Sequence, residues 1–379
     1  MVFVSVLAFF MASTSLAFVA PYSVALRALG ILLIVFAGIW KPQSGSASLF
    51  RKSELGFFFV GVGFSTFLLG SEVLHGHLLS LCLGLLSYFA VLIVFYNLLN
   101  RFSTRGIQRS VFSALLTLCV ASLVAGLLYE EVAVENSRLR GLLENSNELG
   151  FLAFSLIAVS LALRGSPVST FIGVAFGGLC IILSASRSSL LAALIFVLLL
   201  AFSGFAKARI LLVVSAFIAL LAWLALGAEG GSGLPIFRTN DSRSVGLQVA
   251  SAALEHSFWS GFGELPIDIG VAGSVFAAAI TGGSLGLIGL FIVYSGLLSG
   301  FSRFGPLSRS FIVAAIIHSF FESWVLSFSS PMLLGFFVVL SSLVKIDNGG
   351  KSAGGSLSEV RTSPPLVGVE EVGRPPHTG

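Results

Sequence analysis

The chain has 379 residues, of which 56% are apolar and only 10% are charged. Because soluble domains carry about 25% charged residues, this composition excludes an ordinary soluble enzyme and indicates a membrane protein with many apolar helices. The net charge is +4, and no basic patch with interleaved aromatic residues points to nucleic acid. The three cysteines lie in apolar runs without CxxC spacing, so neither a disulfide framework nor a cysteine metal site is expected.

Twelve apolar runs follow one another along the chain, and about 20 residues suffice to span a bilayer as a helix. We therefore predict an all-α, polytopic domain of about twelve transmembrane helices over residues 1–345. The first run lacks the basic residues that begin a signal peptide, so we interpret it as a spanning helix. The predicted spans are 2–20, 22–40, 55–71, 77–99, 110–129, 149–163, 167–185, 188–204, 209–227, 271–300, 309–329 and 331–345.

The basic residues set the orientation of these spans. With the N-terminus inside, fifteen of the 21 Lys and Arg residues fall in the inner connections or the C-terminal tail. Cytoplasmic connections carry such an excess, so both termini are expected to be cytoplasmic. Arg27 lies within the second span, and the remaining basic residues fall on the outer side: Arg138, Arg140, Arg187, Arg238 and Arg243.

Two outer segments are long enough to fold over the membrane. They are residues 130–148 and residues 228–270, the second lying between spans nine and ten. Within the second, apolar residues recur at helical spacing from Val245 to His256, which predicts a helix. Residues 346–379 are rich in Gly, Ser and Pro and predict a disordered cytoplasmic tail.

An arginine at the join of spans seven and eight stands in a cluster of serines between Ser184 and Ser189. Arginine near hydrocarbon costs about 2.5–3.5 kcal/mol on insertion scales, so Arg187 calls for an explanation. It is either an interfacial anchor whose side chain reaches the headgroups, or a clamp that holds a phosphate bidentately. Arg238 and Arg243 in the large loop are open to the same two readings, as solvated side chains or as anion ligands.

Other polar groups also admit two interpretations. Asn145 and Asn147 precede the sixth span, where Asn caps helices well, or they bind a ligand. His318 and Glu322 are spaced i, i+4 on the eleventh span, as a structural pair or as a proton-handling one. No spacing of His, Cys and carboxylates predicts a metal site, and no cofactor is expected.

Four short stretches appear in order over residues 140–345. They are Asn145-Ser146-Asn147, Ser186-Arg187-Ser188, Arg243 with Gly261-Phe262-Gly263 after an amphipathic segment, and Gly286-Leu287-Ile288-Gly289. Together they resemble the bacterial O-antigen ligase and O-antigen polymerase superfamily, in its Asn-Pro-Asn, Ser-Arg, Arg to Gly-x-Gly, and Gly-Leu-Leu-Gly motifs. The family's large outer loop also falls at the same place.

The resemblance implies a glycosyltransferase at the periplasmic face of the bacterial inner membrane, acting on oligosaccharide linked to undecaprenyl pyrophosphate. It implies that Arg187 and Arg243 stabilise the diphosphate leaving group. Candidates for the base that helps the acceptor hydroxyl are His256, Glu264 and Asp268. The expected substrate-binding residues are Asn145, Asn147, Arg140, Arg238, Ser186 and Ser188.

The expected partners are a lipid-linked donor, a glycan or lipid acceptor, membrane lipid and other polysaccharide-assembly proteins. The family's ligases carry a His-Asn pair where this chain has Val275 and Phe276, which favours a polymerase. The alternative is a transporter or flippase for a lipid-linked or small anionic substrate. In that reading Arg27, His318 and Glu322 form an ionisable path.

Overall fold

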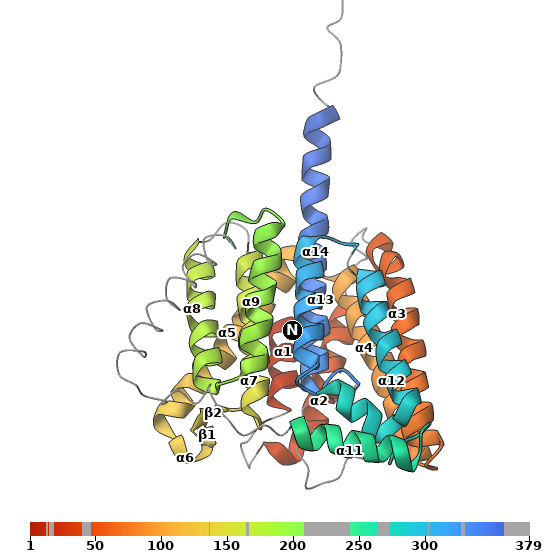
Figure 1. The fold of residues 1–379 in the computed structure, drawn as a ribbon. Coiled ribbons are helices and arrows are strands. Elements are labelled where there is room, and N and C mark those ends of the chain that lie inside the picture. Colours follow the sequence, from red (N-terminus) through yellow and green to blue (C-terminus); the bar gives the residue numbers. More distant parts are fainter. Residues whose placement is uncertain are drawn as a thin grey trace, which may run out of the picture.

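The computed structural model describes residues 1–12, 14, 19–39, 47–135, 137–163, 167–207, 243–263, 273–301, 303–326 and 330–359. Roughly parallel helices form a bundle, and a small β-hairpin and one crossing helix lie together at one end of it (Figure 1). We call this the hairpin end. The last helix projects from the opposite end, which we call the tail end.

The bundle helices are α1 (Val2–Met11), α2 (Ser23–Ile39), α3 (Ala47–Leu68), α4 (Leu78–Arg101), α5 (Thr104–Leu128), α7 (Ser146–Ala162), α8 (Pro167–Ser184), α9 (Arg187–Phe202), α12 (Ser274–Phe301), α13 (Pro306–Ser319) and α14 (Pro331–Glu359). Short helical turns η1 (Ala20–Tyr22) and η2 (Leu69–Val73) flank α2 and α3. The hairpin end carries α6 (Glu130–Ala133), β1 (Val134–Glu135), antiparallel β2 (Arg138–Leu139) and α11 (Arg243–His256).

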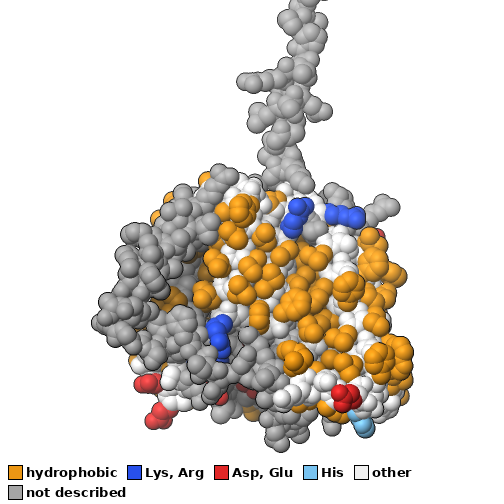
Figure 2. Space-filling model, viewed as in Figure 1, with side chains coloured by type: hydrophobic (Ala, Val, Ile, Leu, Met, Phe, Trp, Pro, Cys, Tyr) orange, Lys and Arg blue, Asp and Glu red, His pale blue; other side chains and the backbone are white. Residues whose placement is uncertain are grey.

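Within the described residues, five helices are long and apolar enough to cross a membrane, with bounds Ser53–Val73, Leu78–Arg101, Thr104–Leu128, Pro167–Ser184 and Ser274–Gly300. Shorter apolar helices accompany them. A band of exposed apolar side chains covers the side of the bundle, with charged side chains toward its two ends (Figure 2). The predicted class, a helical membrane protein, is therefore confirmed, and the ninth predicted span, 209–227, lies outside the described residues.

The first helix is shorter than the apolar run predicts. α1 ends at Met11 rather than near residue 20, and Thr14 forms a β-bridge with Leu143. The Thr14 hydroxyl also donates to the carbonyl oxygen of Leu142 at 2.7 Å. Ser and Thr hydroxyls compete with the helical hydrogen-bond ladder. Here the Thr14 hydroxyl connects the N-terminal segment to the loop after β2.

Helix α7 lies at the centre of the bundle. Its residues from Leu149 to Ala162 are buried, and it packs against α5, α8, α9 and α14. A helix that is apolar on every side is expected in such a position. Its rings stack with those of its neighbours, as Phe154 does with Phe311 at a centroid distance of 5.3 Å. The N-terminus of α7 therefore lies at the middle of the hairpin end.

Glycines let α3 and α12 approach closely. A Cβ on Gly63 would lie 2.5 Å from the carbonyl oxygen of Gly289, and one on Gly300 would overlap Gly56. Small residues at such seams allow tight backbone packing in membranes, where no hydrophobic effect drives helices together. Gly289 also ends the Gly286–Gly289 motif, so packing alone accounts for this glycine.

Helix α12 is broken at Gly283, whose φ is 56° and ψ −142°. The segment after α11 satisfies backbone groups that the break releases. Phe262 N–H donates to the carbonyl oxygen of Ile280 at 2.7 Å, and Ser284 N–H donates to that of Phe258 at 2.8 Å. Non-helical backbone near a membrane is tolerated where it finds such protein partners.

The tail end is tied together by the last helix. Asp347 accepts hydrogen bonds from Ser308 N–H at 2.9 Å and from the Ser308 hydroxyl at 2.7 Å, at the N-terminus of α13. A carboxylate there satisfies amides without an intrahelical partner and complements the helix dipole. Lys345 donates to the carbonyl oxygen of Phe102 between α4 and α5.

The end of α14 differs from the sequence-based expectation. The last span was predicted to end at residue 345 and a disordered tail to begin at 346, whereas α14 continues to Glu359. The contacts of Lys345 and Asp347 lie on the packed part of the helix. Residues 346 and 347 thus belong to the folded bundle.

Candidate functional site at the hairpin end

Asn145 is the N-cap of α7. Its side-chain oxygen accepts from the N–H of Asn147 at 2.8 Å, and its backbone lies in the extended region. This confirms the capping interpretation, which is the ordinary role of Asn before a helix. Asn145 itself is exposed, and Asn147 is half-buried. The cap leaves the Asn147 side chain directed toward the hairpin.

Arg138 on β2 connects three elements, and the sequence-based site did not include it. Its Nη2 donates to Oδ1 of Asn147 at 2.5 Å, and its Nε donates to the carbonyl oxygen of Ser184 at 2.9 Å. Charge-assisted bonds from one planar guanidinium hold both partners in a defined geometry. Arg138 thus fixes the end of α8 relative to the start of α7. The one signal in the sequence was its place on the outer side, against the positive-inside rule.

Arg140, which the resemblance suggested as a substrate ligand, is engaged within the hairpin. Its Nε donates to the carbonyl oxygen of Val132 at 2.8 Å, and Nη1 lies 3.5 Å from Oε2 of Glu135. Half-exposed pairs of this kind contribute about 0–1 kcal/mol. Arg140 therefore closes the hairpin around α6.

The turn between α8 and α9 presents Arg187. Ala185 adopts φ 48°, which is uncommon for a residue with a side chain. Ser186 then caps α9, accepting from Ser189 N–H at 3.4 Å. Arg187 is the first residue of α9 and is exposed, whereas Ser186 and Ser188 are buried. The turn therefore directs an arginine outward at a helix N-terminus, where the dipole adds to its positive charge.

The serines beneath Arg187 join a buried histidine. Ser186 donates to Oγ of Ser189 at 2.8 Å, and Oγ of Ser189 lies 3.0 Å from Nε2 of His318 at the end of α13. Ser188 donates to Oε1 of Glu322 at 3.3 Å. His318 and Glu322 were expected to share a helical face, but α13 ends at Ser319, so they meet at the serine cluster instead.

The cluster is not a nucleophilic triad. Trp324 donates its indole N–H to Nδ1 of His318 at 3.0 Å, so Nδ1 must carry a lone pair and Nε2 the proton. Nε2 then donates to Ser189 and cannot accept the hydroxyl proton, as a general base would. The structural interpretation of His318 is the one this geometry supports.

Several predicted residues of the large loop lie outside the described residues. These are Arg238, Glu264 and Asp268, and of Arg243 only the backbone is described, as the first residue of α11. His256 ends α11, is exposed and lies 5.5 Å from the Phe262 ring, measured between centroids. The predicted helix from Val245 to His256 is confirmed.

The Gly-x-Gly stretch holds the segment after α11 on the broken part of α12. Gly261 and Gly263 have φ of 62° and 79°, which favours glycine, and a Cβ on Gly263 would lie 2.6 Å from the His75 ring. His75 Nε2 is 3.2 Å from the carbonyl oxygen of Ser260. The two glycines of this motif are therefore accounted for by the packing of the segment after α11 against α12 and His75.

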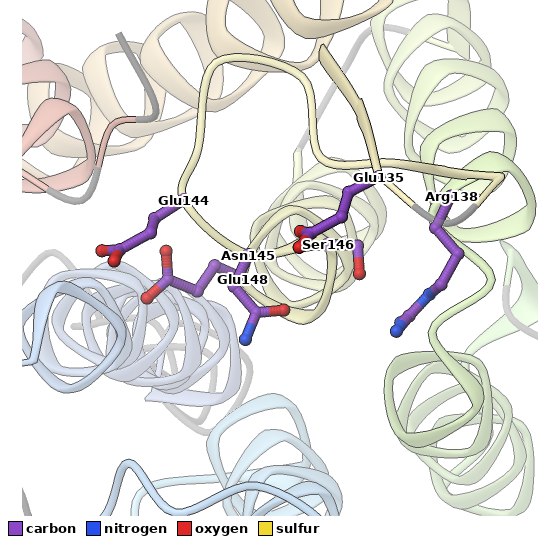
Figure 3. A pocket seen from close by; sticks show the side chains of 6 residues that line it. All are labelled: Glu135, Arg138, Glu144, Asn145, Ser146 and Glu148. Atoms are coloured by element: carbon purple, nitrogen blue, oxygen red, sulfur yellow. The ribbon is translucent and has the colours of Figure 1, made fainter. Parts of the chain in front are cut away.

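A polar pocket of about 470 Å³ opens between the hairpin and the start of α7, lined by Glu135, Arg138, Glu144, Asn145, Ser146 and Glu148. Glu144 and Glu148 lie on one side of it and Arg138 on the other, with Asn145 and Ser146 between them (Figure 3). The pocket thus offers hydrogen-bond donors and acceptors on opposite walls.

Arg27 of α2 belongs to the same end of the bundle. Its charge interacts with Glu148 and Glu144, and its Nε is buried without a hydrogen-bond partner among the described residues. It therefore joins the polar layer at the pocket. The described residues contain no group of three or more His, Cys, Asp or Glu side chains that could hold a metal ion.

The chain matches no protein-family model and no curated protein. Of the sequence-predicted site, the structure brings together Asn145, Asn147, Ser186, Arg187 and Ser188 through Arg138 and Ser184.

Proposed function

We propose that this protein is a membrane glycosyltransferase of the O-antigen polymerase or ligase type, a polymerase rather than a ligase. The observation that carries the proposal is the pair of hydrogen bonds that Arg138 donates, one to the Asn147 side chain and one to the carbonyl oxygen of Ser184. It links the start of α7 to the turn that bears Arg187, and these are two of the stretches behind the family resemblance. A polar pocket adjoins them.

In this proposal the hairpin end faces the periplasm and the tail end the cytoplasm of a bacterial inner membrane. The chain has about twelve spans with both termini inside and its large loop, 228–270, outside. Reporter fusions test this arrangement. Those at Arg105 and Lys351 should read cytoplasmic and one at Ser232 external, and a cytoplasmic signal at Ser232 would remove the proposed site from the donor's side of the membrane.

The reaction follows from the donor, an oligosaccharide on undecaprenyl pyrophosphate. An acceptor hydroxyl attacks the anomeric carbon, the bond from that carbon to the diphosphate oxygen breaks, and a base takes the hydroxyl proton. Negative charge develops on the leaving diphosphate, where Arg187 and Arg243 stabilise it. The candidate bases in the large loop are His256, Glu264 and Asp268.

A transporter or flippase is the second candidate, favoured by the break in α12 at Gly283. Discontinuous helices line substrate sites in many transporters. Here, however, backbone hydrogen bonds from Phe262 to Ile280 and from Ser284 to Phe258 cover the break, and Arg27 joins the polar layer at the hairpin end. These placements favour chemistry at one face over passage through the bundle.

Surface polysaccharide from a strain lacking the gene, separated on a gel, distinguishes the candidates. A polymerase predicts loss of the long-chain ladder with a single repeat unit retained. A ligase predicts loss of every glycan-bearing band. An unchanged pattern in the absence of the protein would contradict both transferase readings and leave the transporter.

A further inference from the structure

The pocket beside α7 has a charge pattern of its own. Three carboxylates line it, those of Glu135, Glu144 and Glu148, together with the guanidinium of Arg138. Two more guanidinium groups act on these carboxylates from outside the lining, Arg140 on Glu135 and Arg27 on Glu144 and Glu148. Three guanidinium groups are thus matched by three carboxylates, which leaves no net positive charge in the pocket to hold a diphosphate. The pocket therefore suits a different part of the substrate from the part that Arg187 serves.

The arrangement of donors and acceptors fits a hydroxylated ring. Carboxylates accept hydrogen bonds only, a guanidinium donates only, and the Asn145 amide does both. Sugar hydroxyls both donate and accept, so a ring between Glu144 and Glu148 on one side and Arg138 on the other finds partners on each wall (Figure 3). The volume of about 470 Å³ admits one or two such rings.

We propose that this pocket is a saccharide-binding subsite that takes the acceptor end of the glycan. The identification of the bound sugar as the acceptor rests on the proposed function. The preference of the pocket for a sugar rests on its lining alone. Arg138 is the connection between the two sites. The guanidinium that lines the pocket also holds the carbonyl oxygen of Ser184, three residues before Arg187.

Binding to the full-length protein in lipid nanodiscs tests the subsite directly. The probe is the set of oligosaccharide fragments released by mild acid from the surface polysaccharide of the source strain, followed by saturation-transfer NMR and titration. The variant combines Glu144→Gln with Glu148→Gln, which keeps shape but removes charge-assisted acceptance. Its matched control is Glu131→Gln, on α6 outside the pocket lining.

The double variant should raise the dissociation constant of the fragments by about tenfold or more, since bonds to charged acceptors are roughly twice as strong as neutral ones. The Glu131→Gln protein should bind as the wild type does. Absence of saturation transfer with the wild type would overturn the proposal. So would equal binding by the double variant and its control.

A further variant separates this inference from the proposed function. Arg187→Ala should retain fragment binding even if it abolishes polysaccharide synthesis. The fragments could bind in a way that depends on the pocket carboxylates while loss of the protein leaves the polysaccharide pattern unchanged. That pair of results would support the subsite and refute the transferase. If loss of the protein abolishes the polymer but fragment binding does not depend on the pocket carboxylates, the transferase is supported and the subsite is refuted.

Discussion

The indole N–H of Trp324 points at Nδ1 of His318 across 3.0 Å and so determines which ring nitrogen holds the proton. The other nitrogen, Nε2, lies 3.0 Å from the hydroxyl of Ser189, which in turn bonds Ser186. A chain of hydrogen bonds therefore runs from the end of α13 to the cap of α9. The exposed Arg187 rests on this buried chain.

Replacing His318 with Leu should destabilise the protein rather than impair chemistry alone. It leaves the buried Trp324 N–H without its acceptor, at a cost of about 1–3 kcal/mol, and it removes one of the two partners of the Ser189 hydroxyl. The expected result is a lower melting temperature in detergent, with residual activity proportional to the folded protein. Ser203→Ala serves as the control, because that hydroxyl bonds only its own helix and is exposed. A His318→Leu protein of normal stability without activity would contradict the structural role.

Arg187 and Arg243 should act on one diphosphate. Arg187→Ala should lower polymer synthesis by about 100-fold to 1000-fold, the usual cost of a lost charge-stabilising donor. Arg187→Lys should remain impaired, because lysine lacks the bidentate fork. If both arginines serve one developing charge, the double alanine variant should fall little below the worse single one. The measurement is polysaccharide chain length at matched protein abundance.

An interfacial anchor makes the opposite prediction for the same arginine. Lysine reaches the headgroups as well as arginine does, so Arg187→Lys would be silent. Any loss in Arg187→Ala would then follow the amount of protein. Chains of normal length from Arg187→Ala at normal abundance would refute the shared clamp.

Gly63 and Gly178 offer a matched pair for the α3–α12 seam. A methyl group at Gly63 meets the carbonyl oxygen of Gly289, whereas one at Gly178 on α8 meets no atom within 4 Å. Gly63→Ala should force the helices apart at a cost of about 1–3 kcal/mol, and Gly178→Ala should be neutral. Thermal unfolding in detergent compares them. Equal melting temperatures would show that the seam yields without cost.

The C-terminal region should divide sharply into a required and a dispensable part. Truncation after Asn348 keeps Lys345 and Asp347 and should leave insertion and activity nearly intact. Asp347→Ala should destabilise the protein by about 0.5–2 kcal/mol, because it removes the carboxylate that caps α13. Asn348→Ala is the control, since that side chain bonds only its own helix, at Val344. Loss of activity in a normally inserted truncation would reveal a role for the tail.

The helices were predictable because apolar runs leave little choice of secondary structure in a membrane, but their ends were not. The run after Met11 stays apolar, and only the partner of Thr14 at Leu142, far away in sequence, shows why α1 stops. In the same way, α14 runs past residue 345 because Asp347 meets Ser308. Such endings depend on contacts between distant segments, which periodicity does not encode.

The candidate site was predictable to a similar degree. Serines around Arg187 and asparagines before α7 stand out by type, whereas Arg138 looks like any loop arginine until Asn147 and Ser184 are placed beside it. The spacing of His318 and Glu322 suggested a shared helical face, and the end of α13 between them removed it. Local patterns therefore identified which residues are unusual, but not which of them touch.

The break in α12 bears on how the chain assembles during synthesis. The segment with Phe258 and Phe262 leaves the ribosome before Ile280 and Ser284, so its backbone partners on α12 are still unmade when it emerges. Until α12 follows, the segment after α11 has only water to satisfy those amides and carbonyls. Docking of the segment after α11 is consequently a late step, and it completes only when α12 has packed beside α3.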